Sequence, residues 1–500
     1  MNISNNSQDS VQYATPTRVV ESTLSTENCP IAATIEDHGQ FRDNKDLTTV
    51  NLPTITNIND CTFFYCSSLT TVDLPKATGI GKSAFACCKS LTTANIPNVI
   101  RINDMAFSSC TSLTSIDLPN AICIDDMAFD DCTSLATINL PKVKYISDSA
   151  FNSCTSLTSI DLPNATRIGW GAFAGCTSLA TANLPNAINI GWGAFRSCKS
   201  LTSVYLPKAE NIALEAFSDC DKLITINLPK ATNIGEMAFR GCKSLTAVDL
   251  PNVENIKSSA FKGCTFLSTV SIPKVTKINI STFSGCVILR GIGETENLTA
   301  IEAEAFSHCI SLTKIDLPNV TSIGDMAFDN CKSLTTIDLP KVEFIGSGAF
   351  DGCESLTTIN MPNVTDIDNN AFHTCTSLTT INLPNAKYIS YNVFNNCKSL
   401  SSVSIPNVKY IYSGAFDGCK SLTTIDLPNV THIDNGAFYY CTSLTSIDLP
   451  NTVEIGERAF YGCTNLTAIH FSAANKSTIE ALSDYSDKWG ATNATIYFDL

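Results

Sequence analysis

Residues 157–176 read LTSIDLPNATRIGWGAFAGC, and near-copies of this stretch make up most of the chain. The leading leucine occurs 20 times, from Leu47 to Leu466, in steps of 22 residues, with one step of 23 between Leu289 and Leu312. A unit this short cannot bury its own apolar face, so copies with a fixed period must stack on their neighbours. The sequence therefore predicts one elongated solenoid, where a compact chain of 500 residues would divide into several domains.

Each copy contains a strand and a return segment. Between Leu69 and Leu74 apolar and polar residues alternate, which is typical of a strand with one buried face. Pro75 ends this strand because proline cannot donate to a sheet ladder. The second half, for example Ile80 to Cys88, places Ile, Ala, Phe and Cys at spacings of four, one and three. We expect this half to form a short helical or 3₁₀ turn.

The 23 cysteines follow the repeat. Nineteen of them occupy one position per copy, three residues after a phenylalanine, and the others are Cys29, Cys61, Cys87 and Cys123. Because free cysteine packs as a small hydrophobe, we expect a buried column of thiols. No C-x-x-C pair occurs and the five histidines follow no ligand spacing, so we predict neither a metal site nor a cofactor. Unpaired thiols suit a reducing cytosol or an anaerobic surface.

Composition and motifs argue against several classes of function. The formal net charge of -15 leaves no basic stripe for nucleic acid and disfavours an anionic membrane surface. No apolar run reaches the length of a membrane span, and the first residues do not read as a secretory signal. The chain shows no paired-carboxylate cleft, no Ser/His/Asp arrangement and no phosphate-binding glycine loop. We therefore predict a protein that is not an enzyme.

The repeat divides the chain into five parts. These are residues 1–44, an N-terminal polar segment and cap; 45–286, a first repeat arm; 287–298, an irregular repeat; 299–471, a second arm; and 472–500, a C-terminal cap.

Two of these parts carry further signals. In the irregular repeat Gly291 and Gly293 weaken the strand, which predicts a bulge or a change of curvature; a hinge and neutral repeat drift both remain open. In the last part, helical apolar spacing over 476–490 and a strand at 495–498 predict a cap that lays Trp489 over the final coil.

The candidate binding residues are apolar side chains in columns that are otherwise polar. Trp170, Trp192 and Leu214 fall on consecutive coils, two positions after an isoleucine, where other coils carry Asp104, Asp126, Asp148 and Glu236. Exposed, clustered aromatic residues are favoured as binding hot spots, although the return segment could instead cover them. A second cluster spans two adjacent coils and suits recognition because tyrosine gives contact area at low entropic cost; it consists of Tyr388, Tyr391, Tyr410 and Tyr412.

The strand positions that face solvent alternate between acid and amide, for example Asp73, Asn95 and Asp117. Rungs of a parallel sheet lie about 4.8 Å apart, so an interleaved amide removes repulsion between carboxylates. We interpret this row as structural. At Asp316 and Asp338, and at Asp426 and Asp448, two acids are neighbours; such pairs could hold Ca²⁺ or could simply be solvated.

The pattern Leu-x-x-Ile-x-Leu-Pro followed by Ile-Gly-x-x-Ala-Phe-x-x-Cys resembles the BspA-like (type 5) leucine-rich repeats of microbial surface proteins. The resemblance implies a leucine-rich-repeat solenoid: a curved right-handed β/α superhelix with a parallel sheet on the concave face and short helical or 3₁₀ turns on the convex side. It also implies a non-enzymatic, adhesin-like protein at the cell surface or outside the cell, with host matrix proteins or other microbial surface proteins as partners.

Two other functions remain open. The missing signal and the thiol column favour an intracellular, cytoplasmic protein–protein interaction scaffold. The regular Thr and Asp rows could serve a structural or ice- or mineral-binding ladder.

Overall fold

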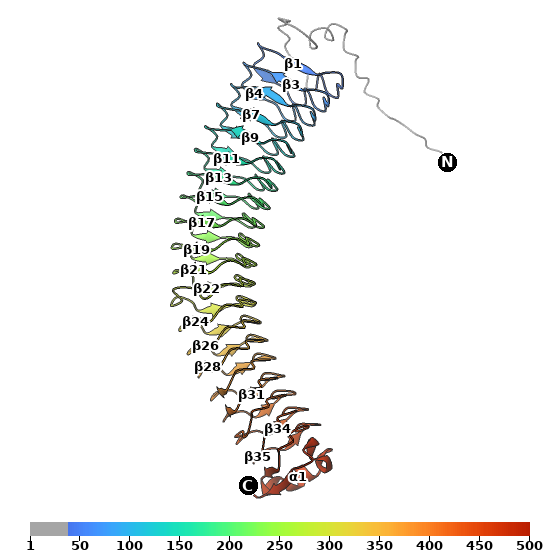
Figure 1. Cartoon of the computed structure of the whole chain (residues 1–500), viewed down its shortest axis with the longest axis vertical. Helices are drawn as coiled ribbons and strands as arrows, with labels where there is room; N and C mark the ends of the chain where they lie inside the picture. Colours follow the sequence, from blue (N-terminus) through green and yellow to red (C-terminus); the bar gives the residue numbers. More distant parts are fainter. Residues whose placement is uncertain (1–38) are drawn as a thin grey trace, which may run out of the picture.

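The computed structural model describes residues 39–500, which form one long, curved solenoid (Figure 1). Most coils contribute one strand of three or four residues to a long-strand face and one strand of two residues to a short-strand face, and the coil that begins at Leu422 joins the long-strand face only through bridges at Asp426. Strands pair in parallel with the equivalent strand of the next coil, as in Val50 opposite Val72 and Ile58 opposite Ile80. The described residues contain nineteen short strands, so the predicted stack of repeat units is confirmed.

The long-strand face is built from β1 (Thr49–Asn51), β3 (Thr71–Asp73), β5 (Thr93–Asn95), β7 (Ser115–Asp117), β9 (Thr137–Asn139), β11 (Ser159–Asp161), β13 (Thr181–Asn183), β15 (Ser203–Tyr205), β17 (Thr225–Asn227), β19 (Ala247–Asp249), β21 (Thr269–Ser271), β24 (Lys314–Asp316), β26 (Thr336–Asp338), β28 (Thr358–Asn360), β30 (Thr380–Asn382), β32 (Ser402–Ser404), β35 (Ser446–Leu449), β37 (Ala468–Phe471) and β38 (Thr495–Phe498).

The short-strand face is built from β2 (Asn57–Ile58), β4 (Gly79–Ile80), β6 (Arg101–Ile102), β8 (Cys123–Ile124), β10 (Tyr145–Ile146), β12 (Arg167–Ile168), β14 (Asn189–Ile190), β16 (Asn211–Ile212), β18 (Asn233–Ile234), β20 (Asn255–Ile256), β22 (Lys277–Ile278), β23 (Ala300–Ile301), β25 (Ser322–Ile323), β27 (Phe344–Ile345), β29 (Asp366–Ile367), β31 (Tyr388–Ile389), β33 (Tyr410–Ile411), β34 (His432–Ile433) and β36 (Glu454–Ile455).

The return segment is a series of turns, and the helical or 3₁₀ turns expected there are not found within the coils of residues 39–471. In a typical coil Ser149 and Ser153 both have positive φ, a conformation that interrupts any right-handed helix. The N–H groups of Ser149 and Phe151 donate to carbonyls of the following coil, Trp170 O at 2.6 Å and Ala172 O at 2.8 Å. Because neighbouring coils take up these backbone groups, the segment needs no helical bonds of its own.

The interior consists of stacked columns, of which the phenylalanine column is the bulkiest. From Phe41 to Phe460, rings of successive coils lie parallel, with centroids 5.1–5.7 Å apart. Side chains of the Leu, Ile, Ala and Phe positions are almost fully buried along the stack. The columns therefore merge into one continuous core without a break between the two repeat arms.

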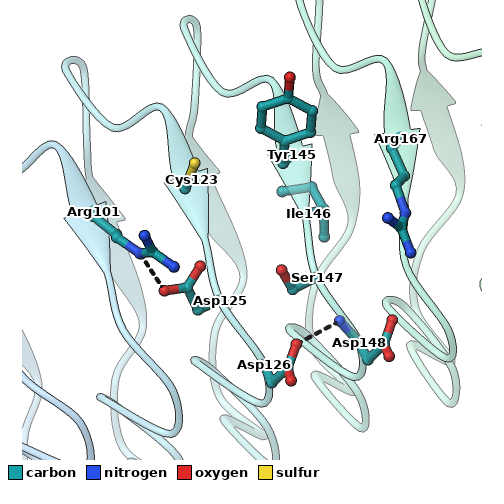
Figure 2. Close-up of a pocket in the computed structure, with 9 residues that line it drawn as sticks. All are labelled: Arg101, Cys123, Asp125, Asp126, Tyr145, Ile146, Ser147, Asp148 and Arg167. Atoms are coloured by element: carbon teal, nitrogen blue, oxygen red, sulfur yellow. Dashed lines mark hydrogen bonds and ion pairs between the residues drawn. The ribbon is translucent and has the colours of Figure 1, made fainter.

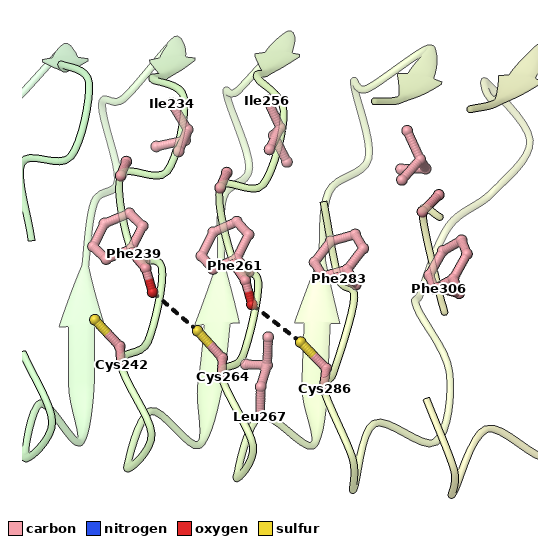
Figure 3. Packing of buried hydrophobic residues seen from close by; sticks show 14 of the residues in the cluster. Ile234, Phe239, Cys242, Ile256, Phe261, Cys264, Leu267, Phe283, Cys286 and Phe306 are labelled. Carbon is pink, nitrogen blue, oxygen red and sulfur yellow. Dashed lines mark hydrogen bonds between the residues drawn. The ribbon is translucent and has the colours of Figure 1, made fainter. Parts of the chain in front are cut away.

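The cysteine column lies beside the phenylalanine column (Figure 3). Each column thiol donates to the carbonyl of a phenylalanine in the preceding coil, as Cys264 Sγ does to Phe239 O at 3.2 Å and Cys286 Sγ to Phe261 O at 3.3 Å. Burial raises the pKa of the Cys264 thiol to about 12. All cysteines between residues 39 and 500 are free, as predicted, and Cys29 lies outside the described residues.

Both ends of the described chain cover the last regular coils. At the N-terminal end Phe41, exactly one period before Phe63, stacks on it at 5.3 Å, and its N–H donates to Thr62 O. Residues 39–44 are therefore the second half of a further coil.

At the C-terminal end η1 (Ala473–Asn475), α1 (Lys476–Glu480) and η2 (Tyr485–Gly490) precede β38. β38 extends the long-strand face by pairing with β37. Trp489 is fully buried, with its ring 6.0 Å from that of Phe471.

The 23-residue step changes only the long-strand face. In that coil the long strand is reduced to a single bridge between Ser271 and Gly293. The short-strand face continues without interruption, since Lys277 pairs with Ala300 across the step. The extra residue is therefore absorbed on one side of the solenoid.

Candidate functional site

In each coil, the residue two positions after the short strand belongs to one column on the surface of the solenoid. Three consecutive members of this column, Trp170, Trp192 and Leu214, are called the Trp patch. Their side chains are 56%, 46% and 36% exposed, so the return segment does not cover them. Their backbones are held in place: Gly171 N–H donates to Trp192 O at 2.7 Å and Gly193 N–H to Leu214 O at 2.9 Å. The two indole rings meet edge to face, with centroids 6.1 Å apart and an interplanar angle of 66°. The hydrogen-bonded backbone of these coils therefore presents three apolar side chains to solvent.

An open hollow of about 310 Å³ lies on the short-strand face beside the Trp patch. Small residues form its floor: Gly169, Gly191 and Ala213. A Cβ on Gly191 would lie 2.7 Å from backbone atoms of Gly169, so the close approach of these two coils requires glycine. Arg167, Asn189 and Asn211 line the side opposite Trp170.

A second hollow of about the same volume adjoins the first, and both are lined by Arg167 (Figure 2). Figure 2 shows Tyr145 between Arg101 and Arg167, which lie at opposite ends of this hollow. Arg101 forms an ion pair with the buried carboxylate of Asp125. The other lining residues are Cys123, Asp126, Ile146, Ser147 and Asp148. We call the two hollows together the axial groove, because they share Arg167 and their lining residues span six successive short strands, from β6 to β16.

A ladder of amides forms one wall of the axial groove. Asn211 Nδ2 donates to Asn189 Oδ1 at 3.1 Å, and Asn233 Nδ2 donates to Asn211 Oδ1 at 3.3 Å. An amide group has two N–H donors and two acceptor lone pairs, so each member keeps capacity for a further partner. The sequence reasoning did not single out this row, although Asn recurs there in step with the repeat.

The Tyr cluster, defined as Tyr388, Tyr391, Tyr410 and Tyr412, also lies on the short-strand face. The ring of Tyr412 is central, 5.0 Å from Tyr391, 6.2 Å from Tyr388 and 6.5 Å from Tyr410. Tyr391 and Tyr410 are exposed, whereas Tyr388 and Tyr412 are half-buried. The Tyr388 hydroxyl donates to Asp366 Oδ1 at 2.7 Å, and this bond raises the pKa of Tyr388 to about 12.

A third apolar cluster, which sequence reasoning missed, surrounds the 23-residue step. Phe266, 60% exposed, occupies the polar position before the coil's leading leucine, and exposed Ile288 follows it one coil later. Half-buried Val287 and exposed Ile310 occupy the preceding position on successive coils. The sequence does carry a signal for this cluster, because the first column is Ser in most other copies and the second is Thr, Ser or a charged residue.

The acid and amide row on the long-strand face is internally bonded. Asn95 Nδ2 donates to Asp73 Oδ1 at 2.7 Å, and Asn183 Nδ2 donates to Asp161 Oδ1 at 2.7 Å. Asp316 and Asp338 are paired rungs, and Lys314 Nζ lies 3.0 Å from Asp316. Residues 39–500 hold no group of three or more His, Cys, Asp or Glu side chains arranged to bind a metal ion.

No helix in the part of the chain that the structure describes is long and apolar enough to cross a bilayer.

The sequence profile of the BspA type leucine-rich repeat region (6 copies) matches nearly the whole chain, at residues 34–142, 101–223, 188–310, 299–407 and 387–486. The chain belongs to the BspA type leucine-rich repeat family. This agrees with the repeat pattern and with the parallel solenoid, and it confirms the predicted resemblance. No curated protein matches the chain.

Several solved structures are similar to this BspA type protein. A leucine-rich repeat protein from Bacteroides ovatus ATCC 8483 is 28% identical, with a TM-score of 0.61, and the match covers 68% of this chain and 92% of the other. A T. pallidum leucine-rich repeat protein is 34% identical over 34% of this chain and 83% of its own, with a TM-score of 0.30. A leucine-rich cell surface protein from Faecalibacterium prausnitzii A2-165 is 28% identical over 68% and 86%, with a TM-score of 0.35.

Proposed function

We propose that this BspA type protein is a non-enzymatic, protein-binding solenoid that acts as an adhesin-like protein at a microbial cell surface. Its partners are host matrix proteins or other microbial surface proteins. The observation that carries this proposal is the Trp patch, where three apolar side chains on consecutive coils are exposed in a column that is largely polar elsewhere. Large apolar side chains exposed together mark interaction sites, and tryptophan is enriched among binding hot spots.

The Tyr cluster is proposed as a second contact surface on the same face of the solenoid. Three tyrosine rings packed around that of Tyr412 give a broad, amphipathic surface with exposed aromatic rings at Tyr391 and Tyr410. A partner that spans both surfaces would bind more tightly than either surface alone allows.

The test is a variant with Trp170→Ala, Trp192→Ala and Leu214→Ala, compared by surface plasmon resonance against a panel of purified matrix proteins and against intact microbes. Loss of a hot spot costs about 2 kcal/mol or more, so we expect affinity to fall by at least about 30-fold. The matched control is Ile100→Ala with Ile122→Ala, which removes exposed apolar surface from two other successive coils. An unchanged affinity in the folded triple variant would contradict the proposed site.

The alternative is an intracellular interaction scaffold, which is favoured by the column of free thiols. The two can be separated by protease treatment of intact cells. Release of repeat peptides supports the surface location, whereas full protection followed by digestion after lysis supports the scaffold.

A further inference from the structure

We propose that the axial groove binds a carboxylated oligosaccharide, with its sugar rings laid along the solenoid axis. This inference deepens the proposed function and rests on it, because the feature recognised on the partner is then an acidic glycan. The groove crosses six short strands, and with rungs about 4.8 Å apart it is about 25 Å long, enough for several sugar rings in a row.

The aromatic wall provides the apolar contact that a sugar needs. One face of a pyranose ring presents mainly C–H groups, which pack against the electron-rich face of an indole. Trp170 and Trp192 are exposed, and their edge-to-face arrangement forms a corner that can hold one ring and bound the next. Exposed Tyr145 offers a further ring in the adjoining hollow.

The amide wall provides the polar contact. A sugar hydroxyl both donates and accepts, as an amide does, and the Asn189–Asn211–Asn233 ladder offers donors and acceptors at the spacing of the coils. In the second hollow one oxygen of Asp126 accepts from Asp148 N–H at 3.2 Å, and one oxygen of Asp148 accepts from Trp170 N–H at 2.8 Å. The remaining carboxylate oxygens can accept hydroxyl protons. The glycine floor lets a rigid ring come close to the backbone.

Arg167 supplies the charge preference. Its side chain is exposed and lines both hollows, and among residues 39–500 its guanidinium group forms no ion pair or hydrogen bond. Arg101 at the other end is already bound to Asp125 (Figure 2). An unpaired guanidinium matches the geometry of a carboxylate through two parallel hydrogen bonds, which selects a uronic or sialic type of sugar over a neutral one.

An extended peptide suits this groove less well. The short strands from β6 to β16 are paired on both sides in one ten-stranded sheet, so no free edge is available for strand addition. The peptide's own N–H and C=O groups would then depend on side chains alone. A sugar has no peptide N–H and C=O groups, so its hydroxyls can bind side chains without pairing with a strand.

The test uses the intact protein with a panel of carboxylated probes (oligosaccharides of hyaluronan, polygalacturonate and alginate, and a sialylated trisaccharide), with chitohexaose as a neutral probe. Of the three tryptophans, Trp170 lines the groove, Trp192 touches the ring of Trp170, and Trp489 is fully buried, so intrinsic fluorescence reports binding directly. Isothermal titration calorimetry gives the affinities. We expect at least one carboxylated probe to change the fluorescence and to bind about tenfold more tightly than chitohexaose.

Three variants define the outcome. Arg167→Gln should remove the preference for the carboxylated probe, and Trp170→Ala with Trp192→Ala should remove binding. Tyr440→Ala with Tyr461→Ala, which deletes two exposed aromatic rings outside the groove and the Tyr cluster, should bind as the wild type does. The inference is overturned if no carboxylated probe binds at about millimolar concentration, or if Arg167→Gln keeps the full preference.

The failure of this inference can be told apart from that of the proposed function. Binding of the protein partner is compared before and after enzymatic removal of its glycans. If the triple variant of the Trp patch loses the partner but the deglycosylated partner still binds, the glycan inference fails and protein recognition stands. If the triple variant binds the partner normally, both fail.

Discussion

Raising the pH should destabilise this protein steeply, because its core holds a column of buried thiols. Burial raises the pKa of these thiols in the folded state, to about 12 for Cys176 and Cys264, from an ordinary value of 9.0. A thiol is neutral when protonated, so the folded state retains protons that the unfolded chain releases. Stability is therefore fully present below about pH 9 and is lost as the pH rises from there toward the folded pKa.

The size of the effect follows from proton linkage. With an unfolded pKa near 9, one such thiol costs about 0.4 kcal/mol at pH 9 and about 1.4 kcal/mol at pH 10 relative to neutral pH. Over the eighteen column thiols from Cys66 to Cys441, whose pKa burial raises, this comes to more than about 20 kcal/mol at pH 10, beyond the stability of most domains. We expect unfolding between pH 9 and pH 10 at room temperature.

The assay is urea unfolding followed by circular dichroism from pH 7 to pH 10, with a reductant present. The control changes Cys220, Cys242, Cys264 and Cys286 to Ala; it lacks four ionisable core groups and should lose about 6 kcal/mol less between pH 7 and pH 10. This comparison cancels the titration of Tyr and Lys, which both proteins share. A free energy of unfolding that stays constant to pH 10, or an identical pH dependence in the two proteins, would refute the reasoning.

Three further predictions concern the core, the groove floor and accessible thiols. In the native protein at pH 8, a thiol reagent should label the half-buried Cys61, Cys87 and Cys123 but not the buried cysteine column. The same reagent in urea should label every cysteine. Rapid labelling of the column in the native protein would contradict its burial. Phe239→Ala, in the middle of the ring stack, should lower the free energy of unfolding by about 3–5 kcal/mol, measured in urea, and Phe266→Ala, which is exposed, should change it little. Gly191→Ala places a Cβ 2.7 Å from the Gly169 backbone and should cost about 1–3 kcal/mol, measured by thermal unfolding; a stability equal to wild type would show that the coils can separate freely.

The sequence predicted the core because every interior position recurs in register. Leu, Ile, Phe and Cys reappear after each period, so a residue such as Phe261 can only meet its own counterparts, Phe239 and Phe283, in the neighbouring coils. The same logic places Trp170 and Trp192 side by side, and in the structure their rings touch. Short-range periodicity, repeated many times, therefore fixed long-range contacts.

The return segment was harder to predict because its conformation depends on the neighbouring coils. The spacing of Ile, Ala, Phe and Cys fits a helical turn as well as it fits a series of tight turns. What decides between them is that Ser149 and Phe151 donate to the next coil, an interaction that a single copy cannot reveal. The stacking of Phe41 on Phe63 was not predicted for a related reason. The half-coil that contains Phe41 lacks the leading leucine that marks each complete copy of the repeat.

The amino-acid sequence by itself determined the parallel stacking, the buried columns and the row of apolar residues on consecutive coils. With a strict period, only one register between neighbouring coils buries every column of apolar residues. Only the tertiary structure decided that the Arg167 side chain is left unpaired, that the asparagines form a bonded ladder and that two hollows share Arg167. These features depend on how side chains from different columns of several coils are oriented toward one another across the face, and a one-dimensional repeat does not specify those angles.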